Sequence, residues 1–176
     1  ARDYVVPFET FLQDISTDGF DARIASGGGR QTITMDRYDA NWPMVARGWR
    51  THVLGEGPQF ANATAAVHGL REKHSGTIDQ DLPEFIVADN GKPIGTIEDG
   101  DAVVFYNFRG DRAIEISRAF VEEDFDFFGR TLSGTPQLRE RWRRGIGLVD
   151  SLAGEATGQL YVQRHFAPQA KERMQV

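Results

Sequence analysis

The feature that most limits the possible folds is an alternation of helix-like and strand-like segments along residues 20–120. Apolar residues spaced three and four apart predict helices at residues 4–15, 40–54, 60–73 and 111–120. Shorter apolar segments predict a strand centred on Ile24, a hairpin in EFIVADNGKPIGTI and a buried strand at residues 103–105. This alternation predicts an α/β fold.

Each predicted helix carries apolar side chains that we expect to be buried, at least in part. They are Phe8, Leu12 and Ile15; Trp42, Val45, Trp49 and Val53; Ala65, Ala66, Val67 and Leu70; and Ile114 and Ile116. Turns are predicted at Asp18-Gly19 and at residues 98–101.

Composition and charge exclude several classes of protein. The 176-residue chain has a net charge of −6, which argues against a general nucleic-acid binder, and it has no cysteine for disulfides or thiolate metal sites. It lacks a run of about 18 apolar residues that could span a membrane. Its first residues have neither the basic nor the apolar part of a signal peptide, so we expect a cytoplasmic protein without a membrane partner.

Charge is distributed unevenly, which predicts a boundary near residue 128. Residues 1–127 carry 12 Lys/Arg and 22 Asp/Glu, a net charge of −10, whereas residues 128–176 carry 8 and 4, a net charge of +4. Beyond the boundary, Thr135-Pro136 is typical of a helix start, and a helical spacing of apolar residues runs from Leu138 to Leu160. We therefore predict an α/β domain at 1–127 and a purely helical extension at 128–176.

Four arginines lie at predicted strand ends or in loops, where α/β folds place ligands. They are Arg30, which follows three glycines, Arg37 in TMDRYD, and Arg109 and Arg112 in NFRGDR. A guanidinium group fits carboxylate and phosphate oxygens in bidentate fashion, and Gly27–Gly29 would let backbone N–H groups approach an anion. The alternative is that each arginine pairs with a nearby acid such as Asp36 or Asp111 and only ties loops together.

Other residues that could carry chemistry form no recognisable set. The four histidines, His52, His68, His74 and His165, lack the spacing of metal ligands, and we expect Glu98, Asp99 and Asp101 to be a solvated turn. No nucleophile elbow or phosphate loop is present. Ser26 lies close to the arginines in sequence, but we expect nothing beside it that could activate it.

Several motifs in residues 4–127 closely resemble the cofactor-independent phosphoglycerate mutases. They are DARIASGGGR, ITMDRYDANWPMVARGWRTHVLGEG, IDQDLP, GKPIGTIEDGDAVVFYNFRGDRAIEISRAF and EEDFD. The resemblance implies the substrate-binding phosphotransferase domain of that family, an α/β domain inserted in a larger phosphatase-like domain. It implies a role in glycolysis, in which the intact family interconverts 2- and 3-phosphoglycerate.

The same resemblance implies the site residues. Arg30, Arg37, Arg109 and Arg112 match the family arginines that hold the carboxylate and phosphate of phosphoglycerate. Asp3 matches the end of a substrate-binding Asp-Gly-Arg-Asp motif, although Ala1 stands in the place of the glycine. Alternatively, residues 1–5 begin the following helix.

The resemblance also implies what this chain lacks. In the family, a serine nucleophile and two divalent metal ions, usually manganese, belong to the phosphatase-like domain, and none of those motifs is found here. We therefore expect no cofactor in this chain, no catalytic residue and no activity by the chain alone. The expected partners are a small anionic substrate and the missing domain.

Residues 125–176 instead resemble a helical segment of the neprilysin-type zinc endopeptidases. The matching patterns are FFGRTLSG, RWRR, AGEATGQLYV and FAPQAKERM, and the segment lies upstream of that family's zinc motif. This second resemblance implies a chimera, engineered or generated by joining two fragments near EDFDFFGR, with a natural fusion as the other origin. Two alternative functions follow: a chimeric fold without catalytic function, and a fragment of a zinc metallopeptidase.

Overall fold

The computed structural model describes residues 2–33, 41–98, 101–104, 114–122, 124–130 and 162–163. The chain forms two compact units: Ala1–Asp36 with Pro43–Thr96, and Arg37–Trp42 with Ile97–Val176. The longer segment of the second unit begins at Ile97. The division between the two units therefore falls within the α/β domain that was predicted at residues 1–127. Each unit is described by itself.

The first unit is built around strand β3, Phe85–Asp89. It pairs antiparallel with β1 (Ser26–Gly27), parallel with β2 (Gln59–Phe60), and antiparallel with β4 (Lys92–Pro93). Residues 90 and 91 join β3 to β4 with φ values of 49° and 78°, the left-handed backbone of a two-residue hairpin turn. The predicted hairpin is confirmed, whereas the first strand lies two residues beyond Ile24.

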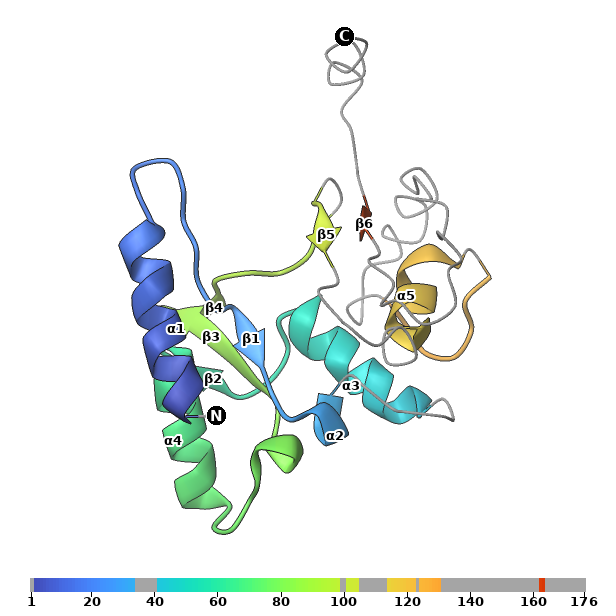
Figure 1. Cartoon of the computed structure of the whole chain (residues 1–176). Coiled ribbons are helices and arrows are strands. Elements are labelled where there is room, and N and C mark those ends of the chain that lie inside the picture. The colour runs from blue at the N-terminus through green and yellow to red at the C-terminus, as the bar shows by residue number, and fades with distance from the viewer. Residues whose placement is uncertain are drawn as a thin grey trace, which may run out of the picture. The chain divides into compact units, whose positions relative to one another are not determined.

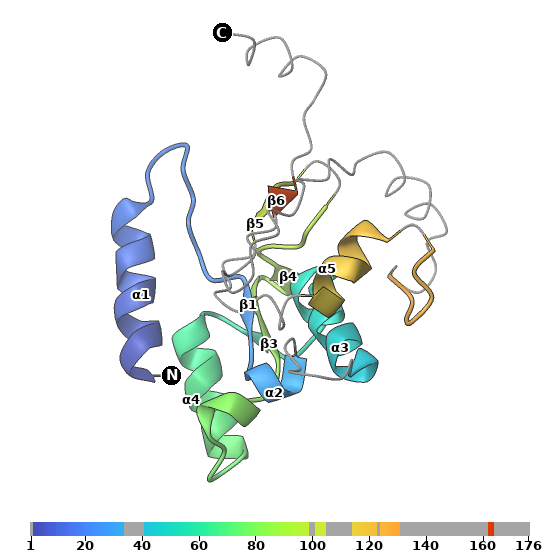
Figure 2. The ribbon, with the colours of Figure 1, turned by 45° about the vertical axis from the view of Figure 1, so that its right-hand side comes forward.

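Two helices cover opposite sides of this sheet (Figures 1 and 2). Helix α4, Ala63–Lys73, packs with β3 through a buried cluster of Ala63, Ala66, Val67, Leu70, Leu82, Phe85 and Val87. Ile86, 1% exposed, points to the other side because strand side chains alternate. Helix α3, Trp42–His52, lies on that side and buries Val45, Trp49 and, just beyond its end, Val53, as predicted.

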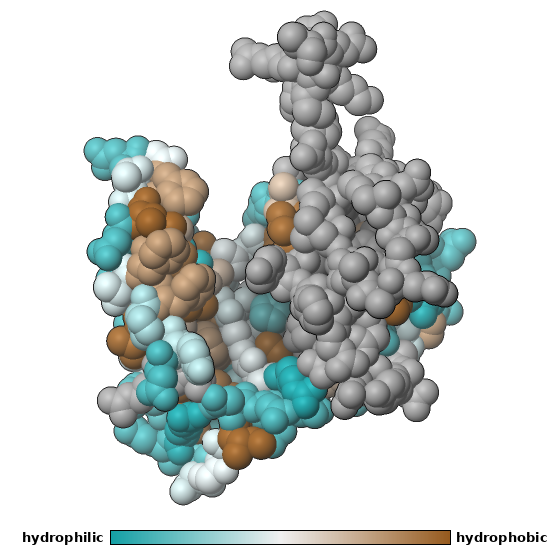
Figure 3. All heavy atoms as spheres, in the orientation of Figure 1, coloured by the Kyte–Doolittle hydropathy of each residue, from teal (hydrophilic) through white to brown (hydrophobic). Residues whose placement is uncertain are grey.

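Helix α1, Arg2–Ile15, packs against α4, but not through the face that the apolar spacing predicts. Val5, Glu9 and Leu12 are half-buried, whereas Phe8 and Ile15 are exposed. Figure 3 shows apolar side chains gathered on the surface over α1, where Tyr4, Val6 and Phe11 are also exposed. Only Leu12 of the three predicted residues therefore lies on the packed face.

Two short elements complete the first unit. Helix α2, Arg30–Ile33, follows the glycine run, and the 3₁₀ helix η1, Asp79–Asp81, precedes β3. The two pack against each other. Helix α4 has the predicted buried residues except Ala65, which is exposed.

The described part of the second unit contains helix α5, Ile114–Val121, and a strand pair. Strand β5, Val103–Val104, pairs antiparallel with β6, Val162–Gln163. The prediction of a purely helical extension is therefore wrong at β6, where two residues form a strand that the local apolar spacing does not reveal. Val104 is 59% exposed and Ile114 45% exposed, so the predicted burial of Val104 is also wrong.

An aromatic cluster packs beside α5 in the second unit. Trp42 stacks on Phe127 with ring centroids 3.9 Å apart, and Phe125 meets both rings edge-on. The Arg130 guanidinium donates to the carbonyl oxygens of Ala119 at 3.0 Å and Glu122 at 2.8 Å, which satisfies acceptors at the end of α5. Residues 125–130 thus pack with α5 and lie on both sides of the boundary predicted near residue 128.

Candidate anion-binding site

Arg30 is the predicted site residue whose side-chain geometry is best defined. It opens α2 directly after the glycines and is half-buried. Its Nε donates to the Gln80 side-chain oxygen at 2.7 Å, and Nη2 donates to the same oxygen. Among the described residues its partner is thus a neutral amide rather than an acid, so its charge is not neutralised by this contact.

The glycine run before Arg30 is required by close packing. A Cβ at Gly29 would lie 2.3 Å from the Gln80 carbonyl oxygen and 2.6 Å from the Leu82 nitrogen. The Gly29 N–H donates to the Leu82 carbonyl oxygen at 2.7 Å. The expectation that these glycines offer N–H groups to an anion is therefore wrong at Gly29, whose N–H already has a partner in the protein.

Threonine and arginine side chains stiffen the same region. The Thr32 hydroxyl lies 2.7 Å from the carbonyl oxygens of both Gly29 and Leu82. The Arg47 guanidinium, from α3, donates to the Thr32 carbonyl oxygen at 2.9 Å. These contacts tie α2, the residue after η1 and α3 together around Arg30.

The remaining predicted site residues are less well placed. Arg37, Arg109 and Arg112 lie outside the described residues, as do Asp36 and Asp111, the acids of the alternative interpretation. Asp3 lies in the first turn of α1 and is exposed, which agrees with the alternative in which residues 1–5 begin that helix.

Ser26 has a neighbour that the sequence did not reveal. Its hydroxyl lies 2.8 Å from Nδ1 of His52, and both side chains are half-buried. Burial lowers the pKa of His52, which favours a neutral ring that can accept the hydroxyl proton. The expectation that nothing beside Ser26 could take its proton is therefore wrong. The two residues are 26 positions apart, and no local pattern joins them.

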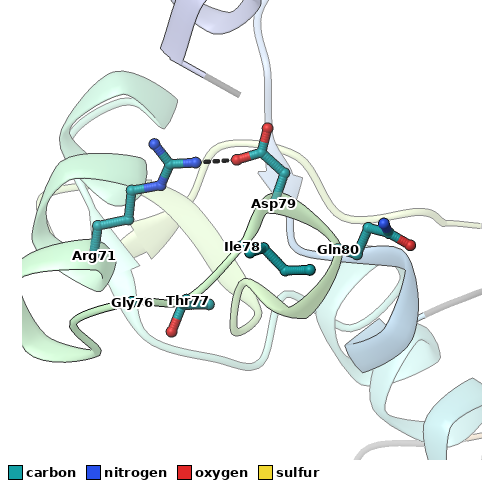
Figure 4. A pocket seen from close by; sticks show the side chains of 6 residues that line it. All are labelled: Arg71, Gly76, Thr77, Ile78, Asp79 and Gln80. Atoms are coloured by element: carbon teal, nitrogen blue, oxygen red, sulfur yellow. Dashed lines mark hydrogen bonds and ion pairs between the residues drawn. The ribbon is translucent and has the colours of Figure 1, made fainter.

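An open hollow of about 570 Å³ lies beside η1. It is lined by Arg71, Gly76, Thr77, Ile78, Asp79 and Gln80. Figure 4 shows the Arg71 guanidinium paired with the Asp79 carboxylate, while the Gln80 side chain points away from that pair. Neighbouring residues of η1 therefore hold two different arginines.

The described residues contain no group of three or more histidine, aspartate and glutamate side chains arranged to hold a metal ion. Asp101 and Glu98 close a turn, in which the Asp101 carboxylate accepts the Glu98 N–H at 2.8 Å. None of the helices among the described residues is both long and apolar enough to cross a bilayer.

The fold and the arginine beside η1 define an α/β domain with a candidate site for an anionic ligand. Residues 1–143 match the family described as BPG-independent PGAM (phosphoglycerate mutase) N-terminus. The chain belongs to this family. The match extends 16 residues past the predicted boundary at residue 127.

Individual relatives agree with this family. A Leptospira interrogans protein named "Probable 2,3-bisphosphoglycerate-independent phosphoglycerate mutase" is 60% identical over 130 residues, which is 74% of this chain and 24% of the relative. The Trypanosoma brucei brucei mutase is 58% identical over 123 residues, 69% of this chain and 22% of the relative. A probable Arabidopsis thaliana mutase is 42% identical over 166 residues, and the match covers 86% of this chain and 30% of that relative.

A solved structure confirms the fold class. The Leishmania mexicana phosphoglycerate mutase, crystallised at low cobalt concentration, superposes with a TM-score of 0.70 and 52% identity. The superposition covers 73% of this chain and 24% of that protein. The chain thus spans between a fifth and a third of the length of these relatives.

Proposed function

We propose that this chain is the substrate-binding part of a 2,3-bisphosphoglycerate-independent phosphoglycerate mutase and binds 2- and 3-phosphoglycerate in glycolysis, in the cytoplasm. The observation that carries the proposal is the family match over residues 1–143, together with relatives named as mutases. The Arg30 geometry supports it, because a guanidinium held by a neutral amide keeps its charge for an anion.

The proposed binding residues are Arg30, Arg37, Arg109, Arg112 and Asp3. Phosphoglycerate carries a carboxylate and a phosphate, and arginine forks bind both groups bidentately. Arg30 provides one such fork at the start of α2. We propose that Arg37, Arg109 and Arg112 also bind the anionic groups of the substrate.

Metal ions and the chemical step belong, in this proposal, to the phosphatase-like domain of a longer protein. The described residues offer no set of side chains that fits the two divalent ions of the family, so no metal-dependent step is assigned to them. The chain by itself then binds substrate without turning it over, with the missing domain as its partner.

A titration tests the binding proposal. We expect 3-phosphoglycerate to shift NMR resonances of Arg30 and its neighbours with a Kd of about 1 mM, or roughly −4 kcal/mol, because a single domain provides only part of the contacts. Arg30→Gln should abolish the shifts. Arg23→Gln is the matched control, since Arg23 is an exposed residue paired with Asp21 and also loses one positive charge. An unchanged spectrum at tens of millimolar ligand would refute the proposal.

For the C-terminal residues we propose a separate origin, as the neprilysin-like resemblance of residues 125–176 suggests. The change of charge near residue 128 supports this, and 33 residues follow the family match. A chain ending at residue 143 should then bind 3-phosphoglycerate with unchanged affinity. Loss of binding or of folding would show that residues 144–176 belong to the domain.

A further inference from the structure

The Arg30–Gln80 contact joins residues that are 50 positions apart, and both partners are held by the backbone around them. Arg30 directly follows Gly29, whose N–H donates to Leu82, and Gln80 lies in η1, two residues before Leu82. The Gly29 backbone is so close to η1 that even one added carbon would overlap the Gln80 carbonyl oxygen. The backbones that carry the two side chains are therefore held close together by packing, while the Gln80 side chain itself is exposed.

The chemistry of the contact differs from that of the neighbouring arginine. Asp79 and Gln80 are adjacent in η1, yet Asp79 pairs with Arg71 (Figure 4), whereas Gln80 accepts from Arg30. A carboxylate neutralises the guanidinium that it holds, whereas an amide oxygen accepts the same two N–H groups without a counter-charge. Arg71 is thus paired with a carboxylate, whereas the partner of Arg30 among the described residues is a neutral amide.

The orientation of the contact leaves part of the Arg30 fork available. Nε and Nη2 donate to a single Gln80 oxygen, which uses two of the five guanidinium N–H groups. Holding a long side chain in one rotamer in advance removes an ordering cost that ligand binding would otherwise carry. A fixed, charged and partly unused fork is what binding of a phosphate or carboxylate requires.

We propose that Gln80 is a positioning residue that holds Arg30 in the orientation that binds the anionic group of the substrate while leaving its charge intact. This inference rests on the proposed function, because it assumes that Arg30 contacts the ligand. It adds that the residue at position 80 must be a neutral acceptor: an acid there would hold Arg30 equally well and compete with the substrate.

The test uses the 176-residue chain, 3-phosphoglycerate as the probe and two substitutions with different effects. Gln80→Glu keeps the shape and adds a carboxylate, so Kd should rise about tenfold and binding should become less sensitive to salt, since one charge is neutralised. Gln80→Met removes the acceptor but adds no charge beside Arg30. Kd should therefore rise about threefold, because Arg30 is less well ordered, while the salt dependence stays that of the unmodified chain. A merely structural role of Gln80 would not alter salt dependence selectively.

Two controls separate the possible failures. Gln13→Glu adds the same charge at an exposed position of α1 and should leave Kd unchanged. Thermal unfolding of each variant and the Arg30 Nε–H resonance report whether the fold and the contact persist. If Arg30→Gln leaves affinity unchanged, the proposed function fails and this inference with it. If Arg30→Gln weakens binding but Gln80→Glu binds as well as the unmodified chain, only the role of Gln80 is refuted.

Discussion

At the scale of single residues, two buried hydroxyl groups illustrate opposite energetic situations. The Thr51 hydroxyl, in a residue that is 1% exposed, donates to the Arg47 carbonyl oxygen at 2.9 Å. The Ser117 hydroxyl, in a residue that is 5% exposed, has no hydrogen-bond partner among the residues that the structure describes. A buried polar group without a partner costs about 1–3 kcal/mol of desolvation, because no hydrogen bond offsets the loss of water.

These two residues give a matched prediction. Ser117→Ala removes the unpaired hydroxyl and should raise the free energy of unfolding by about 1 kcal/mol. Thr51→Val keeps the shape but breaks a hydrogen bond and leaves a carbonyl less well satisfied, so it should lower that free energy by about 1 kcal/mol. Urea unfolding of both variants measures the difference, and a loss of stability in Ser117→Ala would contradict the first expectation.

The burial of His52 predicts a dependence of stability on pH. Burial lowers the pKa of His52, so below about pH 6.5, the ordinary value, the unfolded chain binds a proton that the folded chain resists. The contribution of His52 to stability is therefore fully present above that pH and is lost as pH falls from it toward the lower folded-state pKa. His52→Gln, which does not titrate, should flatten this part of the profile.

The control for this pH effect is His74→Gln, at an exposed position just after α4. It should leave the pH profile of the unmodified chain in place. Urea unfolding at pH 7.5, 6.5 and 5.5 checks both variants. An equal loss of stability on acidification in the unmodified chain and in His52→Gln would show that His52 does not carry the effect.

At the scale of elements, the docking of α1 on α4 depends on one carboxylate. Glu9 of α1 accepts the backbone N–H groups of Ala63 at 2.8 Å and Thr64 at 3.1 Å, together with the Thr64 hydroxyl. These N–H groups lie at the start of α4, where donors have no partner within the helix and a negative charge is favourable. Glu9 therefore links two helices and caps one of them.

Removing the charge of Glu9 should weaken this link. Glu9→Gln loses the favourable interaction with the helix terminus and one acceptor oxygen, so we expect the free energy of unfolding to fall by about 1–2 kcal/mol. Asp14→Asn, the same kind of acid-to-amide change on α1 but at an exposed position, is the control and should change that free energy by less than about 0.5 kcal/mol. Hydrogen exchange at Ala63 and Thr64 should quicken in Glu9→Gln alone.

The elements also show which parts of the fold were predictable from sequence. The Asn90-Gly91 hairpin and the buried face of α3 were predicted correctly because both depend on local rules, a turn dipeptide and a helical spacing. The packed face of α1 was predicted wrongly, because that face is selected by α4 through Glu9, a polar residue that an apolar pattern ignores. A two-residue strand such as β6 has too few residues for any periodic signal.

The candidate site divides in the same way. Arg30 was predicted from its position after the glycines, and the structure places it at the start of α2. Its partner Gln80 and the Ser26–His52 pair join residues 50 and 26 positions apart, which no local pattern connects. The sequence drew attention to the glycines before Arg30, but it could not show why glycine is needed there. The reason at Gly29 is the close approach of η1, which is a tertiary contact.

At the scale of the whole molecule, the chain corresponds to less than a third of the length of the relatives described above. Its family match covers residues 1–143, and the described residues hold no cluster of metal ligands. Under the proposed function, this chain would bind the substrate and the remainder of a longer mutase would carry out the chemical step.

This separation predicts the outcome of an activity assay. The chain alone, with manganese and 3-phosphoglycerate, should give neither 2-phosphoglycerate nor free phosphate, because phosphoryl transfer needs a nucleophile in line with phosphorus at about 3–3.5 Å and charge neutralisation on the transferred group. Ser26 with His52 offers a hydroxyl and a proton acceptor, so Ser26→Ala is the decisive variant. Turnover by the chain alone that disappears in Ser26→Ala would place the chemistry within this unit.

The complementary experiment adds the missing part in a separate polypeptide, a mutase phosphatase domain that lacks its insert. If this chain provides the substrate site, turnover should appear only when both are present and should rise with the concentration of either. Arg30→Gln should reduce that turnover, whereas Arg23→Gln, with the same loss of charge at an exposed position, should not. Restored turnover that is indifferent to Arg30 would mean that the chain contributes structure rather than substrate binding.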